Sequence, residues 1–281
     1  MKHLLHIGYP KAGSTFLKHW FAHHPCITYN NDDQKGGMAT KKLPKDTGWM
    51  VTCDETLTLT LGEDLSHIPT PQETRDRQAR LAKQIRQNES VHSILMVTRG
   101  ARSLYRSAYS QYLKAGGHLT YDKLRSDQDD RFRAMWDYDY VLELYQSLFG
   151  VDRVWVFPFE WLATNPDQFL RTLEDQLGIP HAAFDRTPKN RALSETAMGQ
   201  YRTLNQCIHG FIRPWPQPLR KRVQAWHRRS LRKGQYSWLL KRIPAKPINC
   251  EPPEDLIKNL STVSQKTRNQ PYVKPFAEYY R

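Results

Sequence analysis

The chain has 281 residues, with 42 Lys and Arg against 28 Asp and Glu, and a formal net charge of +14. This length suffices for one α/β domain with additions, and no apolar run approaches the roughly 20 residues that cross a bilayer. The four cysteines form no C-x-x-C pair, which argues against a structural zinc site and favours free thiols in a reducing compartment. Because an apolar segment follows Met1 almost at once, we expect no signal peptide and a cytoplasmic protein.

The first predicted elements are a buried strand near residues 3–8 and a helix near residues 14–23. The turn between them has a glycine at each end and a lysine, Lys11, inside it, and the helix opens with Ser14 and Thr15. A strand, a tight turn with glycine and a helix N-terminus together aim backbone N–H groups at a phosphate. The sequence therefore predicts a phosphate site at this turn.

This turn differs from the loop that binds the phosphates of ATP. In the ATP loop a lysine directly follows the second glycine, whereas here Ser14 follows Gly13 and the lysine is Lys11. The hydroxyl groups remain available for phosphate oxygens. We expect a nucleotide that is not hydrolysed as ATP or GTP would be, and a P-loop small-molecule kinase is the alternative enzyme.

A second candidate phosphate site follows the buried strand predicted near residues 93–98. Arg99 comes directly after this strand, and a helix near residues 101–115 carries Ser107 eight residues later. An arginine at a strand end offers a fixed fork of donors to a dianionic phosphate. Loop and helix can bring the serine hydroxyl back to the same place. The alternative is an arginine that caps a strand and a serine that faces solvent.

Strands and helices alternate along the rest of the chain. The other strands are predicted near 50–53 and 153–158, and the other helices near 72–88, 130–148, 165–177, 196–208, 217–232 and 253–267. This order predicts an α/β fold, a single P-loop-like domain with a central parallel sheet flanked by helices, plus a basic helical C-terminal region. Ligands of such sheets bind outside the carboxyl ends of the strands, where Lys11 and Arg99 are expected.

The C-terminal third is strongly basic. Residues 196–250 contain twelve Lys and Arg and no acidic residue, with Trp215, Trp226 and Trp238 interleaved. Such a segment attracts an acidic polysaccharide, an anionic lipid surface or nucleic acid. It can also be a solvated face over a core. A non-catalytic polyanion-binding protein is therefore a second alternative function.

The first motif, Pro10 to Leu17, closely resembles the 5′-phosphosulfate loop of the sulfotransferases, which use 3′-phosphoadenosine 5′-phosphosulfate (PAPS) as sulfuryl donor. Arg99 and Ser107 resemble the pair that holds the 3′-phosphate of this donor in the family. Residues 154–180 resemble a late strand and helix of the sulfotransferase domain, and 252–270 resemble the C-terminal helix of bacterial members. Gly100 and Ala101 replace the Asn-Pro of many relatives, and residues 185–250 match poorly.

The resemblance implies a role for each motif residue. Lys11 would neutralise the leaving phosphate, and Arg99 with Ser107 would hold the 3′-phosphate. The donor-binding residues of the loop would be Lys11, Ala12, Gly13, Ser14, Thr15 and Phe16. PAPS would be the co-substrate without a metal, because the lysine and the helix N–H groups supply the charge stabilisation.

The general base is left open. Carbohydrate sulfotransferases use a glutamate a few residues beyond the first helix, and cytosolic ones use a histidine. Aligning the His-Pro pair at 24–25 with that of the carbohydrate type puts Asp33 near the glutamate position, with Asp32 next. Glu55 resembles the acidic residue of the family's E-K-S segment. We therefore expect Asp33, with Asp32, Glu55 or a histidine such as His24 as alternatives.

Together these features predict one sulfotransferase domain over residues 1–281, in which residues 185–250 form a basic helical insertion or an acceptor-side region. The expected reaction transfers a sulfuryl group from PAPS by in-line displacement to a hydroxyl group of a carbohydrate or glycoconjugate. The acceptor could be an acidic polysaccharide or a glycolipid, with peripheral contact to an anionic membrane at its inner face. We expect no nucleic acid partner.

Overall fold

The computed structural model describes residues 1–9, 11–30, 48–58, 69–87, 90–126, 129–184 and 193–281. The chain forms two compact units. The sheet unit comprises residues 1–101, 130–190 and 254–281, and the helical unit comprises residues 102–129 and 191–253. The single sulfotransferase domain expected over residues 1–281 stays a prediction. No helix of the described ranges is long and apolar enough to cross a bilayer.

The sheet unit is built on a five-stranded parallel sheet of order β2-β3-β1-β4-β5. Its strands are β1 (Lys2–His6), β2 (Ile27–Asn30), β3 (Trp49–Cys53), β4 (Val91–Thr98) and β5 (Val154–Pro158). β1 lies at the centre, where Leu4 and Leu5 are buried. Strands covered on both faces read as continuous apolar runs. The predicted α/β fold with a central parallel sheet is confirmed.

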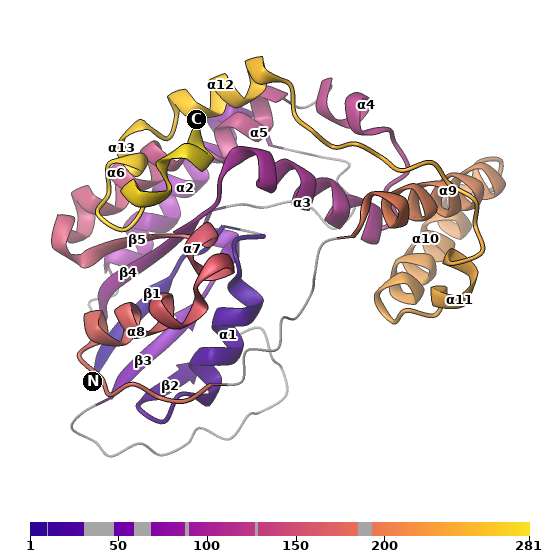
Figure 1. The fold of residues 1–281 in the computed structure, drawn as a ribbon. Helices are drawn as coiled ribbons and strands as arrows, with labels where there is room; N and C mark the ends of the chain where they lie inside the picture. The colour runs from indigo at the N-terminus through magenta and orange to yellow at the C-terminus, as the bar shows by residue number, and fades with distance from the viewer. Residues whose placement is uncertain (10, 31–47, 59–68, 88–89, 127–128, 185–192) are drawn as a thin grey trace. The chain divides into compact units, whose positions relative to one another are not determined.

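Helices cover both faces of this sheet. Figure 1 shows α1 (Ser14–His23) and α8 (Pro166–Leu177) on one face, and α2 (Pro71–Gln87) and α6 (Tyr138–Phe149) on the other. The remaining helical segments of the unit are η1 (Glu55–Leu57), α5 (Asp129–Met135), η2 (Val151–Arg153), α7 (Phe159–Thr164), α12 (Glu254–Thr262), α13 (Gln265–Arg268) and η3 (Lys274–Tyr280). This arrangement leaves the carboxyl ends of the strands at one edge, where the loops after β1, β3, β4 and β5 begin.

Local capping changes two of the predicted helices. The single helix expected over residues 130–148 is divided, because Asp137 caps α6 by accepting a hydrogen bond from the backbone N–H of Tyr140. Residues 159–164, which lie between a predicted strand and a predicted helix, form the short helix α7. It is separated from α8 by Asn165, whose side chain accepts from the N–H of Gln168. Asp and Asn are favoured N-cap residues, so each marks a new helix start.

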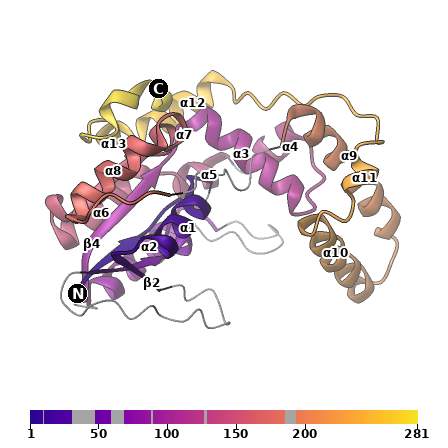
Figure 2. The ribbon, with the colours of Figure 1, turned by 60° about the horizontal axis from the view of Figure 1, so that its bottom comes forward.

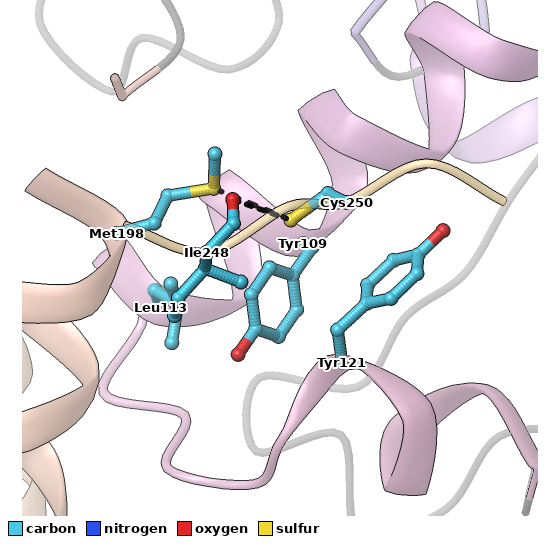
Figure 3. Packing of buried hydrophobic residues seen from close by; sticks show 6 residues of the cluster. All are labelled: Tyr109, Leu113, Tyr121, Met198, Ile248 and Cys250. Carbon is cyan, nitrogen blue, oxygen red and sulfur yellow. Dashed lines mark hydrogen bonds between the residues drawn. The ribbon is translucent and has the colours of Figure 1, made fainter. Parts of the chain in front are cut away.

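The helical unit contains α4 (Tyr121–Ser126), α9 (Glu195–Ile212), α10 (Gln217–Arg232), α11 (Ser237–Leu240) and all of α3 (Ala101–Lys114) except its first residue. Figure 2 shows α9, α10 and α11 as neighbours. One buried cluster, drawn in Figure 3, consists of Tyr109, Leu113, Tyr121, Met198, Ile248 and Cys250. A second joins α9, α10 and α11 through Leu204, Leu231 and Leu240. The unit therefore has apolar packing of its own.

Candidate active site

The loop after β1 has an unusual backbone. β1 ends at His6, and α1 starts at Ser14 with Gly13 as its N-cap, in the left-handed conformation at φ 85°. Lys11 has φ 71°, a region that costs an L-residue about 1–2 kcal/mol. Strain of this kind persists only where the surrounding structure holds the loop. The strained backbone at Lys11 therefore indicates that its neighbours hold this part of the turn.

Two glycines allow close approach at this loop. A Cβ at Gly13 would lie 2.7 Å from Cδ2 of Leu162 and 3.2 Å from the ring of Phe159, both on α7. A Cβ at Gly8 would lie 2.4 Å from Nε2 of His6. A side chain at either position would force a neighbouring side chain to shift, and at Gly13 the loop packs closely against α7.

The start of α1 has the chemistry of an anion site. Ser14 is buried, and its hydroxyl has no hydrogen-bond partner among the described residues, whereas Thr15 is exposed. No side chain caps the helix at Gly13. The first N–H groups of a helix lack intrahelical acceptors, and the helix dipole favours negative charge there. A buried hydroxyl beside such N–H groups fits a phosphate oxygen.

Arg99 reaches this same loop. It follows β4 directly, and its guanidinium donates a hydrogen bond of 2.5 Å to the carbonyl oxygen of Lys11. The guanidinium also lies 4.2 Å from the centre of the Phe159 ring. Burial lowers the pKa of Arg99, and the nearby Glu160 opposes that shift; an arginine nevertheless stays charged in proteins. The structure therefore brings Arg99 to the loop of Lys11, at the carboxyl edge of the sheet.

Sequence reasoning did not identify two side chains that bind the backbone around Arg99, Tyr138 and Glu160, nor Tyr280, which contacts Glu160. The hydroxyl of Tyr138 donates to the carbonyl oxygen of Arg99 at 2.8 Å and accepts from its N–H at 3.3 Å. Oε1 of the buried Glu160 accepts from the N–H of Gly100 at 2.9 Å. Tyr280 joins its hydroxyl to Thr98 at 2.7 Å and lies 3.5 Å from Glu160.

One feature of the sequence could have indicated that Glu160 is a buried hydrogen-bond acceptor. Glu160 is a carboxylate two residues beyond the end of the apolar strand β5, between Phe159 and Trp161. Charged residues are almost never fully buried unless they are paired. An acidic residue in such an apolar context therefore indicates a buried acceptor with a partner, although not which partner.

Ser107 lies on α3 in the helical unit and is buried. Arg99 belongs to the sheet unit. The predicted pairing of these two residues on one phosphate stays a prediction.

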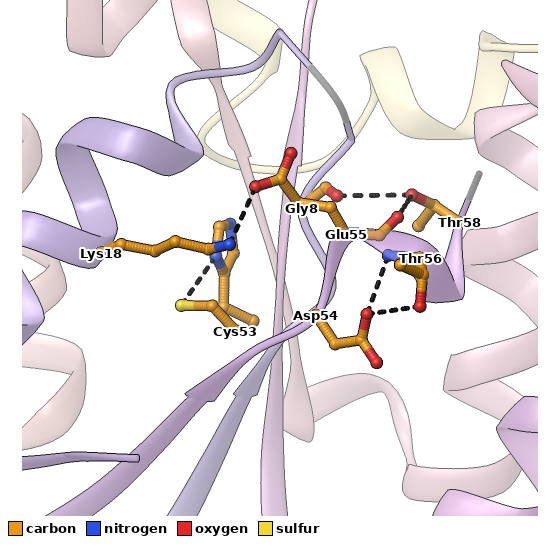
Figure 4. A network of polar contacts seen from close by, with 8 residues as sticks. Gly8, Lys18, Cys53, Asp54, Glu55, Thr56 and Thr58 are labelled. Carbon is orange, nitrogen blue, oxygen red and sulfur yellow. Dashed lines mark hydrogen bonds and ion pairs between the residues drawn. The ribbon is translucent and has the colours of Figure 1, made fainter. Parts of the chain in front are cut away.

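The candidate bases fall in different places. Asp32 and Asp33 lie outside the described residues. Glu55 begins the turn η1 directly after β3, and its carboxylate pairs with Nζ of Lys18 on α1 at 3.2 Å, as Figure 4 shows. The hydroxyl of Thr58, in the same turn, donates to the carbonyl oxygen of Gly8 at 3.3 Å. Glu55 is therefore close to the loop after β1.

His24 lies at the opposite end of α1 from Ser14. It is buried, and its Nε2 is 3.2 Å from Oε1 of Glu174 on α8. Burial lowers the pKa of His24, while Glu174 acts in the opposite direction. This pair joins α1 to α8 away from the loop, which is a structural role. In the described ranges no three His, Cys, Asp or Glu side chains gather as metal ligands.

Comparison with known proteins identifies the fold. No protein-family model and no curated protein matches the sequence. The crystal structure of a sulfotransferase from Alicyclobacillus acidocaldarius is similar with a TM-score of 0.50 and 15% identity, over 76% of this chain and 92% of that one. A mouse sulfotransferase, SULT7A1, complexed with PAP has a TM-score of 0.38 and 14% identity, over 64% of this chain and 59% of that one. The first likeness shows that this chain shares a sulfotransferase fold.

Proposed function

We propose that this protein is a sulfotransferase that moves a sulfuryl group from PAPS to a hydroxyl group of an acceptor. The proposal rests mainly on the hydrogen bond between Arg99 and the carbonyl oxygen of Lys11, at the carboxyl edge of the sheet. The buried, unpartnered hydroxyl of Ser14 at the start of α1 supports it. Two anion-binding elements on one sheet edge suit a donor with two separate phosphate groups.

Each residue has a part in this proposal. The N–H groups of the loop, with Ala12, Gly13 and Phe16 in its backbone and the hydroxyls of Ser14 and Thr15, would hold the 5′-phosphate. Arg99 and Ser107 would hold the 3′-phosphate. When bound, PAPS supplies the sulfuryl group and a phosphate leaving group. Lys11 would stabilise the negative charge that grows on that leaving group, so the proposal requires no metal.

The acceptor hydroxyl must lose its proton during transfer, which calls for a general base. We assign this role to Asp33, on the resemblance to carbohydrate sulfotransferases. Glu55 is the alternative among the described residues, because it lies beside the loop after β1; it is already paired with Lys18. The buried contact of His24 with Glu174 makes that histidine the weakest of the candidates.

The acceptor in this proposal is a carbohydrate or glycoconjugate hydroxyl, such as one on an acidic polysaccharide or a glycolipid. The same resemblance supports this class. The proposal also includes a cytoplasmic location and no nucleic acid partner. Against a P-loop kinase stands the position of the lysine, which precedes Gly13 instead of following it.

The donor can be tested by the effect of nucleotides on thermal unfolding. Adenosine 3′,5′-bisphosphate should raise the melting temperature more than AMP at equal concentration, because only the former carries the 3′-phosphate that Arg99 would bind. A ligand at 100 times its Kd stabilises the folded state by about 2.7 kcal/mol. Arg99→Ala should abolish the difference between the nucleotides, and Arg99→Lys should retain part of it.

Two further variants serve as controls. Arg80→Ala removes an exposed arginine on α2 and should keep the full preference for the bisphosphate. Asp33→Asn should also keep it, while nearly abolishing sulfuryl transfer from labelled PAPS to a glycan panel, since an amide has a similar size but is not basic. Equal shifts from the bisphosphate and AMP in the wild type would refute the donor assignment. Full transfer by Asp33→Asn would instead indicate Asp32 or Glu55 as the general base.

A further inference from the structure

The large apolar side chains that stay exposed are concentrated in one part of the chain. Among the described residues eight such side chains are exposed, and five of them lie between residues 211 and 238 of the helical unit. Phe211, Trp226 and Trp238 are exposed by 69%, 57% and 62%. The five are Phe211, Trp215, Leu219, Trp226 and Trp238, which we call the exposed apolar set. Concentrated exposed apolar side chains mark interaction surfaces, whereas single ones are ordinary.

The positive charge is concentrated in the same unit. The helical unit has 18 Lys and Arg against 5 Asp and Glu, a net charge of +13, whereas the sheet unit has 24 against 23, a net charge of +1. Two of its few acidic residues are already engaged, since Glu195 pairs with Arg106 and Glu251 lies near Arg102. Nearly all of the excess charge therefore accompanies the exposed apolar set.

The helix α10 shows how the two kinds of side chain combine. Its buried side holds His227, whose Nε2 is 2.8 Å from Oδ1 of Asn205 on α9, and Leu231. Residues spaced by three or four positions share one stripe of a helix. The exposed stripe consists of Leu219, Arg222, Trp226, Arg229 and Lys233, which closes the helix.

The segment after α10 also combines aromatic and cationic side chains. The rings of Trp226 and Tyr236 meet edge to face with their centres 6.3 Å apart, and Arg242 lies 5.6 Å from the ring of Trp238. At the other end of α10, the rings of Phe211 and Trp215 lie 5.5 Å apart. Aromatic side chains therefore meet at both ends of the helix, and an arginine joins them beyond its C-terminal end.

We propose that this surface of the helical unit docks onto the headgroup region of an anionic lipid bilayer. Lys and Arg attract anionic headgroups, while Trp, Phe and Leu enter the boundary between headgroups and acyl chains. A polysaccharide or a nucleic acid would also attract the charges, and its rings could stack on Trp. Neither offers an apolar phase in which Leu219 and Phe211 can be buried. A lipid bilayer therefore accounts for both the cationic and the apolar side chains of this surface. This proposal does not depend on the sulfuryl-transfer function.

The test is sedimentation of the whole protein with vesicles. It should bind vesicles that contain phosphatidylserine and should not bind vesicles of phosphatidylcholine alone. Arg222→Gln, Arg229→Gln and Lys233→Gln combined should weaken binding about a hundredfold, because each cation contributes about a factor of five at an anionic surface. The matched control removes three exposed cations of the sheet unit, by Arg80→Gln, Lys83→Gln and Lys258→Gln, and should bind like the wild type.

The apolar part needs a separate variant. Trp226→Ser with Trp238→Ser keeps every charge and should weaken vesicle binding by about tenfold or more, and it should reduce the blue shift of tryptophan fluorescence on binding. Val151→Ser, at an exposed apolar position of the sheet unit, is its control. Circular dichroism checks that each variant is folded.

Two results would overturn the proposal. One is vesicle binding unchanged in the double tryptophan variant together with its full displacement by heparin or DNA, which would make the surface a polyanion site. The other is no binding of the folded wild type to anionic vesicles. Neither result bears on the bisphosphate preference in thermal unfolding, so the two proposals fail separately.

Discussion

Lys11 combines an unfavourable backbone conformation with a proposed catalytic charge. At φ 71° it would be replaced at little conformational cost by glycine, which adopts positive φ freely. Its carbonyl oxygen, which accepts from Arg99, is part of the backbone and remains in any variant. The two roles of this residue, loop shape and charge, can therefore be separated by one substitution.

Lys11→Gly should keep the folded structure, with a melting temperature close to that of the wild type, because the relief of strain offsets the greater freedom of the unfolded chain. Turnover should fall about a hundredfold or more, the effect of removing one preorganised charge donor from a transition state. Binding of the bisphosphate should fall much less, since the leaving-group charge grows only during transfer. Steady-state rates and thermal shifts measure the two quantities.

A comparison variant sharpens this expectation. Lys11→Ala removes the same charge but keeps the strained φ, so it should lose turnover equally and be less stable than Lys11→Gly. Should both variants turn over at the wild-type rate, the assignment of Lys11 to the leaving group would be wrong.

At the scale of elements, the arginine after β4 is held by α6 and α7 instead of by its own loop. Tyr138 opens α6, Glu160 lies on α7, and both bind the backbone of Arg99 or Gly100. Gly100 itself allows this approach, because a Cβ there would lie 2.4 Å from the carbonyl oxygen of Tyr279. The position where many sulfotransferases have Asn-Pro thus coincides with a close packing of the C-terminal segment.

Glu160→Ala should therefore weaken nucleotide binding without touching the nucleotide. It removes the hydrogen bond between the N–H of Gly100 and the Glu160 carboxylate, a bond to a charged group worth about 1.5–3 kcal/mol, and so loosens the backbone that orients Arg99. We expect about a tenfold loss of bisphosphate affinity and a smaller preference over AMP. Calorimetric titration with both nucleotides measures this.

The conservative variant distinguishes positioning from general stability. Glu160→Gln retains an oxygen acceptor for the N–H of Gly100 and should recover most of the preference. A variant Glu160→Ala that is less stable but keeps the full ratio of bisphosphate to AMP affinity would show a merely structural role.

The sequence was sufficient for four of the five strands of the sheet and insufficient for β2, at one of its edges. β1, β4 and β5 were predicted because both of their faces are buried and their residues form continuous apolar runs. β2 was missed because it has only four residues, of which only Ile27 is buried, so its sequence carries no apolar run and an alternation too short to be distinctive. Short edge strands are defined by their pairing, here with β3, which no local pattern reveals.

The same limit applies to the candidate site. The phosphate loop and Arg99 could be predicted, because each follows a buried strand directly. The contact of Gly13 with Leu162 and the clamp of Glu160 on Gly100 join segments far apart in the sequence, and only the fold brings them together. The base is the weakest prediction for a related reason, since its position rests on an alignment of a turn.

At the scale of the whole molecule, the charge is distributed very unequally between the two units. The net charge of +13 on the helical unit implies self-repulsion, which destabilises a compact state. The sheet unit, at +1, has no comparable excess. A protein that holds this many like charges together is more stable where they are screened or neutralised, and an anionic bilayer would do both.

The unequal charge of the two units predicts how salt changes the melting temperature. Raising sodium chloride from about 0.01 M to 0.1 M shortens the screening length from about 30 Å to about 10 Å. Repulsion within the helical unit should therefore weaken, and the melting temperature should rise by about 2–4 °C, the shift that ~1 kcal/mol produces in a protein of this size. The rise should be smaller in Arg222→Gln/Arg229→Gln/Lys233→Gln, and unchanged in Arg80→Gln/Lys83→Gln/Lys258→Gln. Differential scanning calorimetry measures both. A melting temperature that falls with salt would mean that ion pairs outweigh repulsion, and that the basic surface imposes no cost which a lipid partner could relieve.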